Sequence, residues 1–267
     1  MVTCLIHLIP PNLEQKLAAY DLAICRAFAY KIKTQTTDRD WPMTSFAFPQ
    51  DPPLPALDEL RSRVSFLAGL TPELYDSCPN SCICYTGSRA ELDSCPYCKE
   101  ARFHSYGKPR KKFTYLPLIP RLSAFAANPR LAQLRQYRAN YKHEAGKTAD
   151  VFDSKCYQSL RTKRIKVGDT TLPQKYFSDD HDVALGLSTD GFSPFKRRKL
   201  SAWPLIVFDY NLPPELRFHL VSIMSLGVIP KKTKDADSFL WPFVHEMLRL
   251  ASGVPAFDIL LNARFVL

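Results

Sequence analysis

Five of the eight cysteines of this chain lie within one short segment, and this cluster limits the fold more than any other feature. They are Cys78, Cys82, Cys84, Cys95 and Cys98. Two thiolates separated by two residues, as in Cys95 and Cys98, can bind one ion from a single tight turn. A second pair upstream, Cys78 with Cys82 or Cys82 with Cys84, would complete a tetrahedral shell of four thiolates. The spacing therefore predicts a closed, structural Zn²⁺ site.

A cluster of disulfides is the alternative interpretation, and it requires an oxidising compartment. The N-terminal apolar run has no basic segment ahead of it, and Pro10 and Pro11 end it early, which is not typical of a secretory signal. No apolar run is long enough to span a membrane, so no membrane partner is expected. Zinc is favoured for these reasons. Because five cysteines compete for four positions, Cys84 is interpreted as the spare thiol. The predicted zinc ligands are Cys78, Cys82, Cys95 and Cys98.

Basic residues are concentrated in the middle of the chain. The formal net charge is +10, and the excess of Lys and Arg over Asp and Glu falls within residues 101–200. A localised excess favours a polyanionic partner, most simply DNA, whereas a solvated basic face is the alternative. Aromatic residues follow the first of two basic runs, so a base could stack beside the phosphate contacts. The second run could also be a nuclear-entry signal or a solvated loop. The candidate nucleic-acid contacts are Lys108, Arg110, Lys111, Lys112, Lys196, Arg197, Arg198 and Lys199.

Helical periodicity is clearest before and after the cysteine cluster. It predicts a helix capped by Asn12 and a second over residues 57–67, joined by a proline-rich, extended tether at residues 42–55. Asn128 is expected to open another helix, with Arg135 and Arg138 facing outward. Residues 144–180 show little periodicity and are interpreted as a linker.

Three apolar runs in the C-terminal third predict sequential antiparallel strands. A helix capped by Asp237 or Ser238 follows, and a parallel strand is expected to begin in the last apolar segment. The expected fold class is therefore α/β or α+β. Four regions are predicted: a helical N-terminal region with its tether (1–72), a zinc-binding module (73–106), a basic helical bridge or linker (107–181) and a sheet-containing core (182–267).

Asp190 is the candidate for Mg²⁺ chemistry. It follows the first predicted strand and precedes a glycine, so its carboxylate can project into the loops at the edge of the sheet. Two-metal phosphodiester chemistry needs carboxylates from several elements, and a single Asp-Gly pair is more often a simple turn. Asp209 ends the next strand and could face the same site, whereas Asp258 is interpreted as a loop residue.

Several separate motifs resemble the CACTA, or En/Spm-type, transposases, and the likeness is closest to copies spread through fungal genomes. The motifs are residues 188–195, 203–214, 227–230 and 235–242, with 74–82 and 95–98 upstream in the same order. The resemblance covers about residues 57–267. It implies a cut-and-paste DNA transposase with an RNase H-like core and an acidic triad. It also implies that Asp190 is the first triad residue and that the four predicted zinc ligands are the cysteines of the family's knuckles.

The chain departs from the family pattern in its acidic residues. The second aspartate and the glutamate of the family would follow Leu267, so the expectation is a truncated, inactive transposase with an incomplete core. Mg²⁺ would then bind only in the complete relative. DNA carrying the transposon ends is the expected partner, the nucleus the expected location, and a homo-oligomer is left open. Two alternatives remain: a retained zinc-dependent module that binds DNA or protein without catalysis, and a non-functional transposon remnant.

Overall fold

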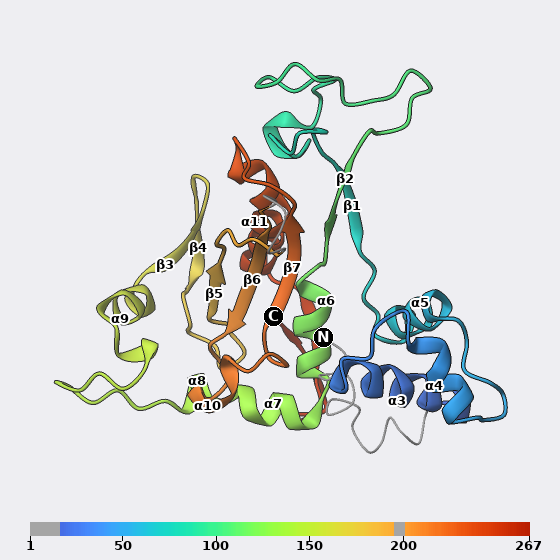
Figure 1. The fold of residues 1–267 in the computed structure, drawn as a ribbon. Coiled ribbons are helices and arrows are strands. Elements are labelled where there is room, and N and C mark those ends of the chain that lie inside the picture. Colours follow the sequence, from blue (N-terminus) through green and yellow to red (C-terminus); the bar gives the residue numbers. More distant parts are fainter. Residues whose placement is uncertain (1–16, 195–200) are drawn as a thin grey trace.

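The structure of the protein is a computed structural model, which describes residues 17–194 and 201–267. The predicted cap at Asn12 and the basic run at residues 196–199 lie outside the described residues. Figure 1 shows a central antiparallel sheet with a long helix packed on it, a group of helices to one side and a loop-rich module carried away on a strand pair.

From residue 17 onward, the helices of the N-terminal group lie in the lower right of Figure 1. They are α3 (Ala19–Lys33), α4 (Trp41–Ala47) and α5 (Leu57–Leu67). The predicted helix over residues 57–67 is confirmed as α5, and its Leu60 and Val64 pack against Ile24 and Phe28 of α3. The prediction that residues 42–55 are extended throughout is wrong for α4. Pro42 lies in the first turn of α4, where a missing N–H costs no helical hydrogen bond.

A two-stranded ribbon leads to and from the cysteine segment (Figure 1). Strands β1 (Glu73–Asp76) and β2 (Lys112–Tyr115) pair antiparallel, with Asp76 opposite Lys112. The intervening residues 77–111 have little regular structure beyond η1 (Gly87–Arg89). The ribbon therefore brings both ends of the cysteine segment to one place.

The helices after the ribbon differ from the prediction. They are α6 (Ile119–Ala126), α7 (Pro129–Arg135) and α8 (Tyr137–Asn140). Asn128 caps α7 as predicted, since the Leu131 N–H donates to its side-chain oxygen at 3.1 Å. The expected outward direction of Arg135 and Arg138 is wrong, because both side chains are buried. A break at Gln136 between α7 and α8 changes the helical register.

Residues 144–180 are more regular than a linker. They contain η2 (Val151–Asp153), α9 (Lys155–Thr162) and the hairpin of β3 (Arg164–Val167) with β4 (Thr170–Lys175). Both strands of this hairpin are largely exposed, so the alternation of apolar and polar residues that indicates a strand is weak. The sequence pattern therefore did not predict the hairpin.

The predicted antiparallel meander is confirmed. Strands β5 (Leu185–Ser188), β6 (Trp203–Asp209) and β7 (Met224–Ile229) form a sheet in the order β5-β6-β7. The short helix α10 (Pro214–Arg217) joins β6 to β7, and α11 (Ala236–Ser252) follows β7. The cap of α11 is Asp235, whose carboxylate accepts from the Ser238 N–H, and not the predicted Asp237 or Ser238.

The core lies between this sheet, α11, β2 and α6. The Leu116 N–H donates to the Leu226 carbonyl at 2.8 Å, which holds the end of β2 against β7. Buried Glu246 of α11 accepts from the Tyr115 hydroxyl at 2.5 Å and from the Leu118 N–H at 2.7 Å. These bonds satisfy a buried carboxylate and tie α11 to the segment between β2 and α6.

The last segment does not form the expected parallel strand. Within the described residues, β8 (Pro255–Asp258) and β9 (Ala263–Val266) pair only with each other, as an antiparallel hairpin. The fold is therefore mixed α/β with small antiparallel sheets.

Candidate metal centre

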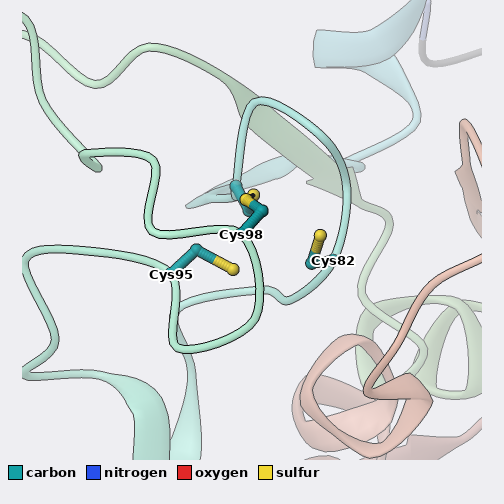
Figure 2. A group of neighbouring side chains, drawn as sticks. Cys82, Cys95 and Cys98 are labelled. Atoms are coloured by element: carbon teal, nitrogen blue, oxygen red, sulfur yellow. Dashed lines mark hydrogen bonds between the residues drawn. The ribbon is translucent and has the colours of Figure 1, made fainter.

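Four of the five clustered cysteines meet at one point in the structure. The sulfur atoms of Cys78, Cys82, Cys95 and Cys98 all lie within 4.8 Å of one another. Figure 2 shows Cys82, Cys95 and Cys98 extending toward a common centre from two loops. Three of the four side chains are buried, and Cys98 is partly exposed. Within the part of the chain that the structure describes, this is the one group of three or more His, Cys, Asp or Glu side chains arranged to hold a metal ion.

Two tight turns bring the thiols together. The Ser81 N–H donates to the Cys78 carbonyl at 2.7 Å, and the Lys99 N–H donates to the Cys95 carbonyl at 2.9 Å. Ser81 and Lys99 both have positive φ angles, 57° and 62°, which reverse the chain just before or just after a cysteine. Each pair of cysteines thus lies on its own knuckle-like turn.

The donor set fits a tetrahedral metal ion. Sulfurs around zinc at a Zn–S distance of about 2.3 Å lie about 3.8 Å apart, close to the spacing seen here. The sulfurs of Cys78 and Cys98 are 3.4 Å apart. Thiols that lie this close together are typical of cysteines that share one metal ion. Zinc would supply structural cross-linking here and no open position for a substrate.

Two of the four thiols, those of Cys82 and Cys98, differ in acidity. Burial and hydrogen bonding with Cys98 raise the pKa of Cys82 to about 12. Burial also acts to raise the pKa of Cys98, but hydrogen bonds from the Asn80 side chain and the Glu100 backbone outweigh it and lower that pKa to about 6. Because metal binding requires thiolates, binding of a metal ion at this site would release protons.

Cys84 lies apart from the four-thiol group. Its thiol donates to the Asp76 carbonyl at 3.4 Å, and its side chain is buried in the main core with Phe113. Its backbone N–H donates to the Ser238 hydroxyl at 2.9 Å. Cys84 therefore packs between the module and α11, as expected for the spare thiol.

The module is attached to the start of α11, a contact that no sequence pattern indicated. The Cys82 carbonyl accepts from the Lys234 N–H at 3.0 Å and from the Asp235 N–H at 3.1 Å. Arg89 pairs with Asp235 at 3.2 Å. A side chain at Gly87 would meet the ring of Trp241 at 2.9 Å, so the module approaches α11 closely. The metal centre is thus fixed to the sheet-containing core.

The basic residues of the predicted DNA-binding run 108–112 lie in different environments in the structure. Lys108 and Lys112 are exposed and make no ion pair with any described residue. Arg110 pairs with Glu100 at 2.5 Å. Lys111 is partly buried and donates to the Ser81 hydroxyl at 2.5 Å. Lys111 therefore supports the turn between Cys78 and Cys82, a role that composition does not distinguish from phosphate binding.

Asp190 lies on the exposed turn after β5, where the sequence placed it. Its carboxylate accepts from the Gly191 N–H at 2.7 Å. Asp209, which could have faced the same site, is fully buried and pairs with Arg135. Asp258 ends β8, not a loop, and bonds to His181 at 2.7 Å. Among described residues, therefore, no cluster of carboxylates forms around Asp190.

The C-terminal part of the chain matches a known family. Residues 162–267 match the family described as transposase family tnp2. The match begins at the end of α9, runs through the central sheet and α11, and leaves the cysteine module outside. No curated protein and no solved structure matches the chain. The match supports a transposase family.

Proposed function

We propose that this chain acts in cut-and-paste DNA transposition, as a CACTA-type transposase polypeptide that binds DNA through a zinc-loaded module. The observation that carries the proposal is the match of residues 162–267 to transposase family tnp2. The sequence motifs quoted above extend the resemblance upstream, through the four cysteines. A fungal-type origin of the element and an RNase H-like organisation of residues 182–267 belong to the same proposal.

The zinc module would act as a rigid DNA-contacting arm. Its four thiols are close enough to share one ion, and the β1–β2 ribbon holds them away from the N-terminal helices (Figure 1). Exposed Lys108 and Lys112 flank the module and are available to phosphates. Contacts of this kind are independent of base sequence and position the protein on the duplex.

Catalysis by the described residues is not part of the proposal. Asp190 could contribute one oxygen ligand to Mg²⁺, but in the described ranges 17–194 and 201–267 it belongs to no group of three or more side chains placed to hold a metal ion. We therefore derive no cleavage step from this site. None of the helices in those ranges is long and apolar enough to cross a membrane. A nuclear location follows from a DNA substrate, and it belongs to the proposal.

Binding of a labelled duplex, followed by fluorescence anisotropy, tests the proposal. The zinc-loaded chain should bind with an affinity that falls steeply as salt is raised, because phosphate contacts release counterions. Removal of zinc with a chelator should weaken binding, and returning zinc should restore it. Binding that is absent, or that is unchanged when zinc is removed, would contradict a zinc-dependent DNA-binding role.

Incubation of supercoiled DNA with Mg²⁺ or Mn²⁺ tests the separate expectation about catalysis. The 267-residue chain should nick no more DNA than its Asp190→Ala variant. Nicking by the parent chain that the variant loses would show that Asp190 belongs to a working active site.

A further inference from the structure

The loop between β7 and α11 is bonded to one of the metal-binding cysteines. This loop, residues 230–235, follows Ile229 and ends at the cap of α11. The Cys82 carbonyl accepts three hydrogen bonds from it: from the Lys234 N–H at 3.0 Å, the Asp235 N–H at 3.1 Å and the Thr233 hydroxyl at 2.6 Å. The residue that offers a thiol to the metal therefore also holds the backbone of the loop.

The loop carries a concentration of unpaired positive charge. Lys231, Lys232 and Lys234 are exposed, and none of them pairs with a carboxylate among the described residues. Asp235, the acid within the loop, already accepts from the Ser238 N–H at 3.1 Å and pairs with Arg89 at 3.2 Å. Asp237 is exposed in the first turn of α11 and offsets one charge, so the surface remains positive.

Strand β2 approaches β7, the strand that leads into this loop. The Leu116 N–H donates to the Leu226 carbonyl at 2.8 Å, and a Cβ added at Gly227 would lie 2.6 Å from the Thr114 carbonyl. Lys112 is exposed at the start of β2.

We propose that Lys231, Lys232 and Lys234 form a binding surface for the phosphate backbone of DNA, and that metal loading at Cys82 positions it. The inference rests on the proposed function, because it names where on this chain the DNA lies. Lysine ammonium groups on flexible stems suit sequence-independent phosphate contacts. The three hydrogen bonds to Cys82 couple the position of these lysines to the order of the metal module. DNA would then lie across the junction between the module and the core.

A charge-removal experiment tests this surface. The triple variant Lys231→Gln, Lys232→Gln, Lys234→Gln is compared with the parent chain by anisotropy on a labelled random-sequence duplex over a salt series. Each lost phosphate contact should reduce the slope of log K against log salt by about 0.9. The matched control is Lys33→Gln, Arg249→Gln, Arg264→Gln, which removes the same charge from exposed positions on α3, the far part of α11 and β9.

The outcomes separate this inference from the proposed function. A reduced slope in the loop variant, with a parental slope in the control, supports the surface. Equal slopes in all three proteins would overturn the surface and leave DNA binding intact. No binding by the zinc-loaded parent would contradict the proposed function itself, and the inference with it. Both variants should retain the zinc content of the parent, which shows that the module is still folded.

Hydrogen exchange tests the coupling to the metal directly. The amides of Lys234 and Asp235 are bonded to the Cys82 carbonyl, so they should exchange faster after zinc is removed. The amide of Val207 in β6, the central strand of the sheet, serves as the internal reference because Val207 is buried and has a paired residue on both sides. Equal exchange of Lys234 and Asp235 with and without zinc would show that the metal does not position the loop.

Discussion

The guanidinium of Arg135 on α7 lies 2.7 Å from the carboxylate of Asp209 at the end of β6, and both side chains are buried. The pair joins the helical bridge to the central sheet. The sequence predicts that Arg135 faces solvent and makes Asp209 a candidate to face a metal site. The buried pair rules out both predictions. Neither residue is available to DNA or to Mg²⁺.

Removal of the charge of Asp209 should therefore destabilise the fold. Asp209→Asn leaves the buried guanidinium without its counter-ion, and the expected loss in unfolding free energy is about 3–5 kcal/mol. Urea denaturation followed by circular dichroism measures it. Asp190→Asn is the control, because Asp190 is exposed and should change stability little. Equal stability of the two variants would show that the Arg135–Asp209 pair does not hold α7 to the sheet.

The metal content of cysteine variants should separate the four grouped thiols from the fifth. Cys98→Ala should lose bound zinc, because three thiolates leave the tetrahedral shell incomplete. Cys84→Ala should keep the zinc content of the parent chain, since its sulfur bonds to the Asp76 carbonyl instead. Elemental analysis of the dialysed proteins gives the ratio. Cys25→Ala, which removes a buried thiol from α3, controls for general effects of losing a cysteine. Loss of zinc from the Cys84 variant with retention in the Cys98 variant would contradict this ligand set.

Gly227 should be intolerant of a side chain. It has a φ of +152°, and an added Cβ would lie 2.6 Å from the Thr114 carbonyl, where β2 approaches β7. Gly227→Ala should therefore cost about 1–3 kcal/mol of stability from overpacking, in addition to backbone strain. Gly168→Ala is the matched control, because Gly168 also has a positive φ but no atom within 4 Å of the new Cβ. Thermal unfolding should show the larger loss for Gly227→Ala, and an equal loss would mean that β2 does not pack so closely on β7.

The ion-pair network of His181 should make stability depend on pH. Burial on its own lowers the pKa of His181, but hydrogen bonds with Asp258 at 2.7 Å and Asp179 at 2.9 Å outweigh it and raise that pKa. A raised pKa in the folded state contributes stability that is complete below the unfolded value and is lost as the pH rises through the folded value.

The parent chain should therefore lose part of its unfolding free energy between about pH 6 and about pH 8, where histidine titrates. Urea denaturation at both values measures the loss. His181→Gln should flatten this dependence, whereas His219→Gln, at an exposed position outside the network, should not. A parental pH dependence in the His181 variant would assign the effect to other groups.

Local patterns were sufficient to predict much of this fold. The apolar runs around Leu205 and Leu226 predicted neighbouring antiparallel strands, and the sheet has that order. The Asn128–Pro129 pair predicted the start of α7, because a side-chain oxygen and a missing N–H both suit the first turn of a helix. The spacing of the cysteines predicted that thiols would come together, because each knuckle turn forms between residues that are close in sequence.

Long-range contacts could not be predicted in this way. The burial of Arg135 depends on Asp209, a residue far along the chain, and the last apolar segment closes on itself as the β8–β9 hairpin instead of joining the sheet. The attachment of Cys82 to residues 233–235 has the same origin. Periodicity and spacing report what a residue does with its neighbours in sequence. Which distant group satisfies a buried charge or a free carbonyl is decided by packing of the whole chain, because each such group must find a partner once water is excluded.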